Sequence, residues 1–438
     1  MIYGATKGPG KIKMQQTGIL KGNILYSKTY EELAVCEGGF LVWKDGKILG
    51  VYSSLPDEYA SFSCEDAGDK LIIPGLIDLH THAPQYPFRG TGMDLELLEW
   101  LNTYTFSEEA KYADIAYAKK AYSGFTEDLK KSATTRACIF ATMHRPATLV
   151  LMDLLEKSGL VTKVGKVNMD RNSPDYLCEE SAEESAFETI EWIKDVLHRK
   201  YENTSPILTP RFIPSCSDEL LDKLKMIQLR YELPVQSHLS ENKSEIEWVK
   251  ELCPDTAFYG DAYDRYGLFG ADAPTIMAHC VYSDEDEQDR MKENGVFVAH
   301  CPESNMNLSS GIAPVRRFLN KGLQVGLGSD VAAGTTLNLF RAMAEAVRVS
   351  KLRWRLQDAD MKPLSFEEVF YMATKGGGAF FGQAGSFEEG YEADVVILDD
   401  SRLVTTKEQT LRGRLERVMY FGDEREVFGK YVKGNKIL

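Results

Sequence analysis

The sequence predicts an α/β protein, a (β/α)8 barrel of the TIM type with a small β-sandwich domain built from both chain termini. Three observations predict this class. Apolar strand-like runs alternate with helical patterns through the middle of the chain. Short strand-like runs with tight turns occupy both ends. All but one of the seven histidines lie at or just beyond the end of a middle strand. We expect the β-sandwich to comprise residues 1–71 and 386–438, and the barrel to comprise residues 72–385.

The N-terminal part predicts a small antiparallel β unit. Its strand-like runs are residues 18–20, 40–43 and 47–52. Asp45-Gly46 separates the last two runs, and this pair favours a type I′ hairpin turn. The same pattern returns at residues 393–398 and 427–438, with a turn at residues 433–435. Because β segments at both ends flank a different middle, we expect them to form one domain.

Eight candidate strands fill the middle of the chain. They are Leu76–His80, Ala133–Ala141, Thr162–Met169, Ile207–Phe212, Pro234–His238, Thr275–His279, Val296–His300 and Gln324–Leu327. Helical patterns separate most of them, for example at Asp218–Tyr231, Ser244–Leu252, Ser283–Asn294 and Pro314–Lys321. Eight strands over about 300 residues fit a barrel, which typically needs ~250 residues before insertions. A doubly wound sheet would give the same alternation, so periodicity favours the barrel only modestly.

The composition is that of a soluble globular protein, with 43% hydrophobic and 27% charged residues. The net charge of −15 argues against partners that are nucleic acids or anionic membranes, and it is compatible with a small neutral or cationic substrate. The eight cysteines show no C-x-x-C spacing, which favours free thiols in a reducing compartment. The first ten residues lack the apolar core of a signal peptide, so we expect a cytoplasmic protein.

Two histidines end the first middle strand, in the stretch Pro74–His82. His80 and His82 are two residues apart, so on a strand their imidazoles share one face, roughly 6.5–7 Å apart. Two such rings can chelate one metal ion. The pair alone leaves open a strand end that simply carries two polar residues.

The remaining strand ends favour the chelating interpretation. His144 follows the second strand, whereas His238, His279 and His300 end the fifth, sixth and seventh, and Asp330 follows the eighth. Active sites of barrels form at the carboxyl ends of several strands. A set of histidines and one aspartate suits Zn²⁺, and also Fe²⁺. The predicted metal ligands are His80, His82, His238, His279 and Asp330.

Glu241 lies three residues beyond His238, at a predicted strand-to-helix junction. A carboxylate there can reach a water on the metal and carry its proton to a leaving group, which is general acid–base catalysis. A bound metal lowers the pKa of that water to ~7, so hydroxide becomes available as the nucleophile. The alternative for Glu241 is a carboxylate at a helix N-terminus, placed there by the helix dipole.

Several segments together resemble the amidohydrolase superfamily in its mononuclear deaminase branch. They are Pro74–His82, His238 with Glu241, Ala278-His279, His300–Asn305 and Gly328–Asp330. Residues 385–399 are similar to the return of that superfamily into its β-sandwich. The predicted fourth strand has no lysine that could be carbamylated to bridge two metals, as in binuclear members. Within the branch, residues 82–90, 97–106, 209–212 and 236–241 most resemble the members that deaminate guanine.

The resemblance implies hydrolysis of guanine to xanthine and ammonia, with one Zn²⁺ per subunit, or Fe²⁺ in its place. Hydroxide attacks C2 of the purine while Glu241 protonates N3. Asp330 helps to take and orient the proton of the water. His279 either completes the metal shell or polarises the water, and both roles stay open. A homodimer is the implied assembly, with no nucleic-acid or membrane partner.

Specificity for a base requires hydrogen-bond partners for its polar edges. Gln85 offers a donor and an acceptor, Arg211 offers donors suited to O6 or N7, and Phe212 can stack on the ring. The alternative for Arg211 is a salt-bridged arginine at the barrel mouth. Trp100 and Phe106 are candidates for part of a lid, although aromatic residues at helical spacing often only pack.

Two other functions stay open. One is a related aminohydrolase that acts on a pterin, a triazine or an adenosine-like compound, against which Gln85 with Arg211 favours guanine. The other is a non-catalytic barrel that serves as a scaffold. Such a scaffold would have lost metal ligands, whereas this chain has all five of them and Glu241.

Overall fold

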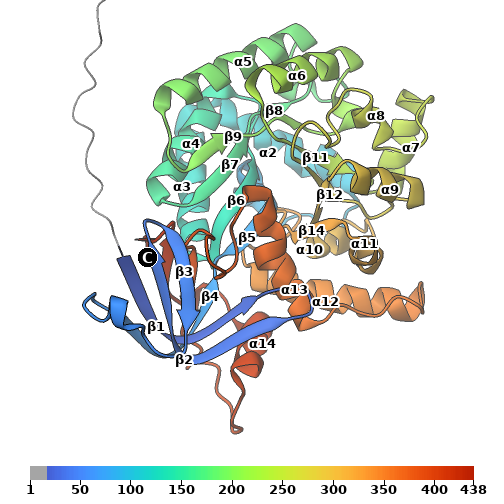
Figure 1. Ribbon diagram of the computed structural model, residues 1–438. Helices are drawn as coiled ribbons and strands as arrows, with labels where there is room; N and C mark the ends of the chain where they lie inside the picture. Colours follow the sequence, from blue (N-terminus) through green and yellow to red (C-terminus); the bar gives the residue numbers. More distant parts are fainter. Residues whose placement is uncertain (1–16) are drawn as a thin grey trace, which may run out of the picture.

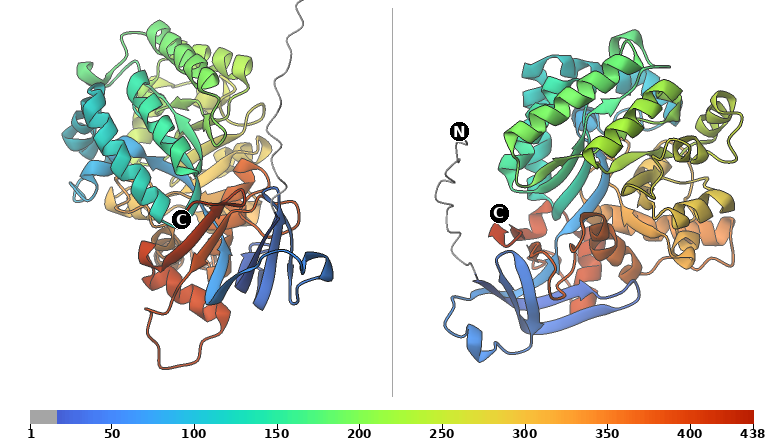
Figure 2. Two further views of the ribbon diagram at one scale, coloured as in Figure 1. Left: turned by 90° about the vertical axis from the view of Figure 1, so that its left-hand side faces the viewer. Right: turned by 45° about the horizontal axis from the view of Figure 1, so that its top comes forward.

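The computed structural model describes residues 17–438, in which two large sheets carry the fold and helices pack around one of them (Figures 1 and 2). The first ten residues, on which the expectation of no signal peptide rests, lie outside the described residues. From residue 17 onward, no helix combines the length and the apolar character that a membrane crossing requires.

The larger sheet is a parallel barrel of eight strands. Their order is β11 (Val235–Leu239), β12 (Thr275–His279), β13 (Phe297–His300), β14 (Gln324–Leu327), β5 (Leu76–His82), β6 (Thr134–Phe140), β7 (Val161–Gly165) and β9 (Thr204–Pro206). The two edges meet where Leu208 forms a parallel bridge with Val235, and the Gln236 amide donates to the Leu208 carbonyl oxygen at 2.9 Å. This closure confirms the predicted barrel over a doubly wound sheet.

The prediction of one continuous fourth strand, Ile207–Phe212, is wrong. β9 joins the barrel, whereas β10 (Thr209–Pro210) pairs with β8 (Val167–Asn168) in a separate two-stranded ladder. Both β9 and β10 end in a proline, which has no N–H to donate and therefore interrupts the ladder. The other predicted barrel strands have ends within two residues of observed ones, except that the third is divided into β7 and β8.

Helices follow most barrel strands and cover the outside of the barrel, whereas α14 packs on the other sheet (Figure 1). The longer ones are α3 (Ile115–Lys131), α4 (Arg145–Ser158), α5 (Ala182–Arg199), α6 (Asp218–Tyr231), α7 (Lys243–Leu252), α9 (Glu285–Glu293), α12 (Leu339–Leu356) and α14 (Leu411–Phe421). Shorter ones are α1 (Leu97–Trp100), α2 (Phe106–Ala110), α8 (Asp261–Asp264), α10 (Pro302–Asn307), α11 (Val315–Lys321) and α13 (Phe366–Tyr371). All four helices named from sequence are present, with ends within two residues of prediction.

Helix α6 illustrates why these segments are helical. The Ser217 side chain caps its N-terminus by accepting a hydrogen bond from the Leu220 amide at 3.1 Å. Leu220, Leu224 and Ile227 are buried at helical spacing, so one face of the helix packs on the barrel. A residue in the left-handed conformation, Glu232 at φ 51°, ends the helix and turns the chain toward β11.

The second sheet takes strands from both ends of the chain. Its order is β17 (Asn435–Lys436), β16 (Val427–Val432), β15 (Val395–Leu398), β4 (Glu65–Pro74), β1 (Thr17–Ser27), β2 (Leu33–Lys44) and β3 (Lys47–Tyr52). The predicted hairpin turn between β2 and β3 is present, with φ of 51° at Asp45 and 79° at Gly46. The sandwich arrangement and the domain boundaries at residues 71 and 385 stay predictions.

Gly75 connects the two sheets, because β4 ends at Pro74 and β5 begins at Leu76. A Cβ atom at Gly75 would lie 2.1 Å from the Thr135 hydroxyl oxygen on the neighbouring strand β6. Because only glycine allows this approach, Gly75 sets where β5 enters the barrel.

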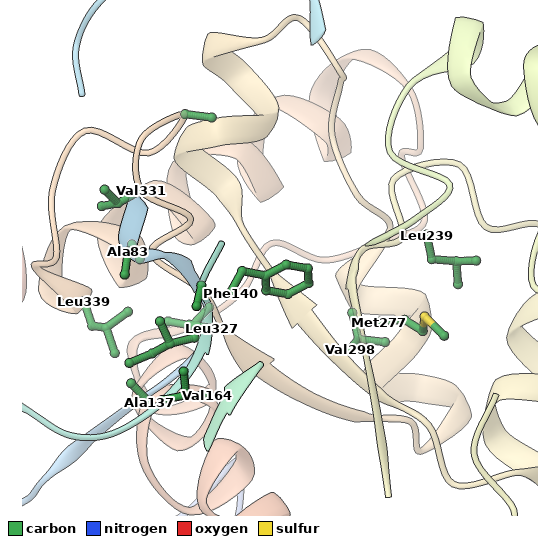
Figure 3. Close-up of a cluster of buried hydrophobic side chains, with 14 of the residues drawn as sticks. Ala83, Ala137, Phe140, Val164, Leu239, Met277, Val298, Leu327, Val331 and Leu339 are labelled. Carbon is green, nitrogen blue, oxygen red and sulfur yellow. The ribbon is translucent and has the colours of Figure 1, made fainter. Parts of the chain in front are cut away.

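Buried apolar side chains from successive strands pack into a contiguous core (Figure 3). Ala137, Val164, Met277 and Val298 are all fully buried. Every residue of β5 is buried as well, including the two histidines at its end. A close-packed interior of this kind moves little, so polar side chains at the strand ends are held on a rigid base.

Buried ion pairs and hydrogen bonds join the barrel to the terminal sheet. Arg136 on β6 donates from Nε to the Asp394 carboxylate at 2.5 Å and also pairs with Glu392. Lys430 on β16 donates from Nζ to the backbone oxygens of Ser132 and Thr134 at 2.8 and 2.9 Å. These contacts satisfy charges that would otherwise be buried alone at the junction of the two sheets.

Replacing Arg136 by methionine should destabilise the protein strongly, because the buried Asp394 carboxylate would lose its partner. We expect the free energy of unfolding to fall by about 3–5 kcal/mol, measured by chemical denaturation. Arg145→Met is the matched control: its pairs with Glu188 and Asp195 are partly exposed, so a loss below about 1 kcal/mol is expected. Equal unfolding midpoints for the two variants would contradict the structural role of Arg136.

Candidate metal centre and active site

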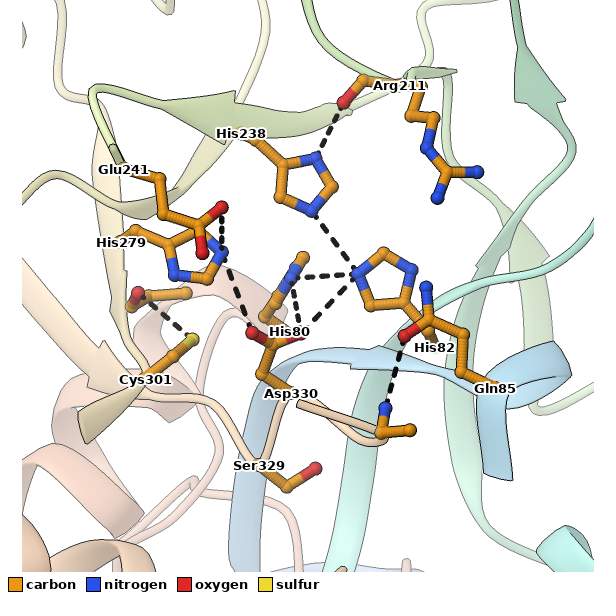
Figure 4. Close-up of polar contacts among 12 residues, drawn as sticks. His80, His82, Gln85, Arg211, His238, Glu241, His279, Cys301, Ser329 and Asp330 are labelled. Carbon is orange, nitrogen blue, oxygen red and sulfur yellow. Dashed lines mark hydrogen bonds and ion pairs between the residues drawn. The ribbon is translucent and has the colours of Figure 1, made fainter. Parts of the chain in front are cut away.

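The structure brings together all five side chains predicted as metal ligands (Figure 4). They come from four barrel strand ends: His80 and His82 from β5, His238 from β11, His279 from β12 and Asp330 from the loop after β14. All except His238, which is partly exposed, are buried. Parallel strands deliver their carboxyl ends to one face of the barrel, which explains the convergence.

The ring nitrogens lie at the spacing that a shared metal ion requires. His82 Nε2 lies 3.2 Å from both His80 Nε2 and His238 Nε2. Asp330 Oδ1 lies 3.2 Å from His80 Nε2 and 3.5 Å from His82 Nε2. Two ligands at roughly 2.0–2.1 Å from a tetrahedral zinc ion are about 3.3 Å apart, so these atoms fit one ion.

Hydrogen bonds on the far side of two rings set which nitrogen faces the cluster. His238 Nδ1 donates to the Arg211 backbone oxygen at 2.6 Å, and His279 Nδ1 donates to the Asn305 side-chain oxygen at 2.9 Å. With the proton on Nδ1, each Nε2 presents a lone pair to the centre. Burial, together with the neighbouring imidazoles, lowers the pKa of His82 and His238 well below the ordinary value, so both rings are neutral.

His279 lies between the cluster and Glu241. Its Nε2 is 3.6 Å from Asp330 Oδ2 and 3.5 Å from Glu241 Oε2, and no hydrogen-bond partner reaches it among the described residues. An unpartnered buried nitrogen is costly unless an ion or a water meets it. The position is compatible with both roles expected for His279, ligand and partner of a water.

Unusual backbone conformations aim these side chains. His279 has φ of 72° and Asp330 has φ of 46°, in the left-handed region that non-glycine residues rarely adopt. Such strain persists where surrounding structure imposes it, and it concentrates at functional sites. The Asp330 amide donates to the His80 backbone oxygen at 2.9 Å, which ties the loop after β14 to β5.

Asp78 supports the cluster from below, and the sequence analysis did not identify it. It accepts hydrogen bonds from the Ser329 amide at 3.0 Å, from the Ser329 hydroxyl at 2.5 Å and from the His80 amide at 3.2 Å. Burial raises the pKa of Asp78 to about 6. The available signal was a carboxylate inside an otherwise apolar, buried run.

The thiol of Cys301 also lies among potential ligand atoms, within 4.8 Å of those of His80, His279 and Asp330. Burial raises the pKa of this thiol well above its ordinary value. The Cys301 thiol donates to the Ala299 backbone oxygen at 3.5 Å. The predicted ligand set therefore needs no cysteine.

Glu241 follows β11, and its carboxyl group is buried. Burial, together with the charges of Glu245 and Asp330, raises its pKa well above the ordinary value. The alternative role at a helix N-terminus belongs to its neighbours: Asn242 caps α7, and Glu245 completes the capping box. This environment favours the protonated form of Glu241, which is the form that a general acid requires.

A pocket of about 420 Å³ of empty space opens above the cluster. It is lined by His82, Gln85, Leu97, Trp100, Leu101, Arg211, Phe212, His238, Glu241, His279, Leu308, Asp330 and Ala333. An apolar wall with a few convergent polar groups is typical of a small-molecule site. Of the predicted site residues, only His80 lies outside this lining, because it is beneath the pocket.

Arg211 and Gln85 meet at a residue that sequence reasoning missed, Glu109 on α2. Arg211 donates to the two Glu109 carboxylate oxygens, at 2.5 Å from Nη1 and 3.1 Å from Nη2. Gln85 Nε2 donates to Glu109 Oε1 at 2.9 Å, and Gln85 Oε1 accepts from the Ala332 amide at 3.1 Å. Arg211 is therefore salt-bridged, as its alternative role required, and it lines the pocket as well.

The other residues noted from sequence take supporting positions. Trp100 lines the pocket, and Phe106 is buried with the Arg211 guanidinium 5.2 Å from the centre of its ring. His300 is buried, and its pKa falls to about 3 through burial and the neighbouring His279. His144 precedes the first turn of α4, and His198 lies on the exposed face of α5.

Known proteins resemble this chain in sequence and in fold. Residues 71–437 match the Amidohydrolase family. A guanine deaminase of Dictyostelium discoideum is 38% identical over 379 residues, which are 85% of this chain and 83% of that protein. A guanine deaminase of Escherichia coli is 35% identical over 423 residues, 92% of each chain. The crystal structure of a guanine deaminase from C. acetobutylicum with bound guanine superposes with a TM-score of 0.94, at 48% identity over 97% of this chain and 100% of that one.

The five-ligand cluster predicts one divalent transition-metal ion per chain. His238→Gln should weaken metal binding by at least about 10²-fold, measured as metal content after dialysis against a weak chelator. His300→Gln is the matched control, because His300 is also a buried strand-end histidine but lies outside the cluster. Equal metal contents in the two variants would remove His238 from the ligand set.

Proposed function

Because the chain belongs to the amidohydrolase family, which it matches over residues 71–437, we propose that it hydrolyses guanine to xanthine and ammonia. One observation carries this proposal: a single pocket joins the histidine–aspartate cluster and Glu241 to the side chains of Gln85 and Arg211. The cluster with Glu241 suits hydrolysis at a carbon that bears an amino group. Gln85 and Arg211 suit the edge of a purine that carries hydrogen-bond acceptors.

One metal ion per subunit is part of the proposal. His80, His82, His238 and Asp330 would hold Zn²⁺, or Fe²⁺ in its place, with His279 as a further ligand or as the partner of a water. When bound, such an ion lowers the pKa of a coordinated water to ~7, so hydroxide is available near neutral pH. His238 and His279 already use Nδ1 in hydrogen bonds, so their Nε2 lone pairs face the cluster. This orientation supports the assignment.

Protons move through the two carboxyl groups beside the ring. Glu241 is neutral, so it can donate its proton to N3 of guanine as C2 is attacked. Asp330 Oδ1 lies 3.2 Å from His80 Nε2 in the predicted ligand cluster, where Asp330 would act as a carboxylate. As a carboxylate, Asp330 can accept the proton of the attacking water and pass it to the amino group, which leaves as ammonia when the C2–N bond breaks. Glu241, ionised after it has protonated N3, can take the proton of the new C2 hydroxyl group, and His279 can orient the water.

Recognition of the base falls to the opposite wall of the pocket. The guanidinium of Arg211 has five N–H donors, and its pair with Glu109 occupies two of them, which leaves three for O6 or N7. Gln85 Nε2 likewise retains one N–H after its bond to Glu109. Phe212 offers a ring face for stacking. The family resemblance further supports a homodimer in the cytoplasm.

Guanine should release ammonia and form xanthine at a rate far above that of a pterin, an aminated triazine or adenosine tested side by side. The assay uses purified protein of known metal content. If guanine is inert and one of the other compounds is hydrolysed, that compound replaces guanine as the proposed substrate. Properly folded protein with no bound metal and no turnover of any compound would favour the scaffold.

Glu241→Gln should keep the metal and lose at least about 10²-fold in kcat, because a proton donor of general acid–base catalysis is removed. Glu247→Gln, on the exposed face of α7, is the matched control and should behave as the wild type. Metal content is measured in both variants so that loss of the ion is not mistaken for loss of the acid. A near-normal kcat for Glu241→Gln would exclude this residue from proton transfer.

A further inference from the structure

Glu109 is a buried carboxylate that the hydrolytic mechanism does not use. Only 3% of the residue is exposed. Its Oε1 accepts from both Gln85 Nε2 and Arg211 Nη2, and its Oε2 accepts from Arg211 Nη1. One carboxylate therefore holds both side chains that are proposed to read the base.

The segment that carries Glu109 also covers the pocket. It consists of α1, a π-helical turn at Leu101–Thr105, and α2. Leu97, Trp100 and Leu101 from this segment line the pocket, and Trp100 Nε1 donates to the Thr91 backbone oxygen at 3.0 Å. Glu109 thus connects the cover of the pocket to the wall formed by the residues after β10.

Physical chemistry explains what the connection does. A two-point contact between a carboxylate and a guanidinium fixes the plane and the rotation of the guanidinium, which a single hydrogen bond does not. The same carboxylate neutralises the positive charge of Arg211, a residue that is only 4% exposed. Without Glu109, the Arg211 side chain would be free to turn, and the remaining N–H groups would not be aimed into the pocket.

We propose that Glu109 is a positioning residue for substrate recognition, which aligns Arg211 and Gln85 and fastens the covering segment, residues 97–110, over the pocket. The identity of the ligand rests on the proposed function. The fastening of the segment does not, because it follows from contacts within the chain. The two parts can therefore be tested separately.

The kinetic test uses Glu109→Gln, which keeps the size of the side chain but places N–H groups against the donors of Arg211. The KM for guanine should rise by about 10²-fold, the scale of a small misplacement of binding groups. The kcat per bound metal should fall much less, because the contacts act on bound base and transition state alike. Glu109→Asp keeps the charge and should recover part of the loss.

Glu108→Gln is the matched control, since it makes the same change one residue away. Glu108 pairs with Lys111 and is 26% exposed. A purely structural role for Glu109 would lower the fraction of folded, metal-loaded protein, and so kcat, while KM stayed constant. A constant KM in Glu109→Gln, with metal content unchanged, would overturn the proposal.

Hydrogen–deuterium exchange provides the second readout, and it needs no substrate. In metal-loaded Glu109→Gln, amides of residues 97–110 should exchange faster than in the wild type, while those of β5 and β11 keep their rates. Glu108→Gln should leave both regions unchanged. If the wild type fails to turn over guanine, the proposed function falls, and exchange alone decides: faster exchange in residues 97–110 supports the fastening role, and unchanged exchange overturns it.

Discussion

The site depends on one electrostatic constraint: four imidazoles and a carboxylate converge on one point, and His238 and His279 direct an unprotonated Nε2 toward it. Lone pairs about 3 Å apart repel one another, so this arrangement suits a cation at their centre. Distant contacts impose it, because Arg211 and Asn305 each occupy the Nδ1 proton of one imidazole and direct its Nε2 inward. The strained backbone at His279 and Asp330, and the Asp78 carboxylate beneath the loop, serve the same alignment.

Arg211 links the candidate metal cluster to the pocket wall that is proposed to bind the base. Its backbone oxygen fixes the tautomer of His238, while its guanidinium lines the same pocket and pairs with Glu109. A shift of the segment after β10 would therefore disturb both the cluster and the recognition wall. The prolines that end β9 and β10 set that segment, because they remove it from the barrel ladder and leave its last residues turned toward the pocket.

Local patterns in the sequence predicted much of the fold and most of the site. The predicted strand ends placed His238, His279 and Asp330 at one face of the barrel. This worked because parallel strands bring their carboxyl ends to the same face, so the position of each side chain along its own strand is enough to predict where it lies. Contacts between distant segments left no such pattern. Glu109 and Arg211 are 102 residues apart, and nothing near Glu109 in sequence indicates a partner on the fourth strand. The sequence did not predict the division of the fourth strand, because its apolar residues favour a continuous strand more visibly than its prolines indicate a break.

Charges in the pocket balance around a neutral base. The pair of Glu109 with Arg211 contributes no net charge, and burial raises the pKa of Glu241, which favours its uncharged form. Asp330 then carries the one unpaired negative charge of the lining. A divalent ion held by the cluster would offset this charge, so the site would not need a charged substrate to balance it. Glu245 makes this possible, because it takes over the capping of α7 and frees Glu241 from any duty at the helix N-terminus.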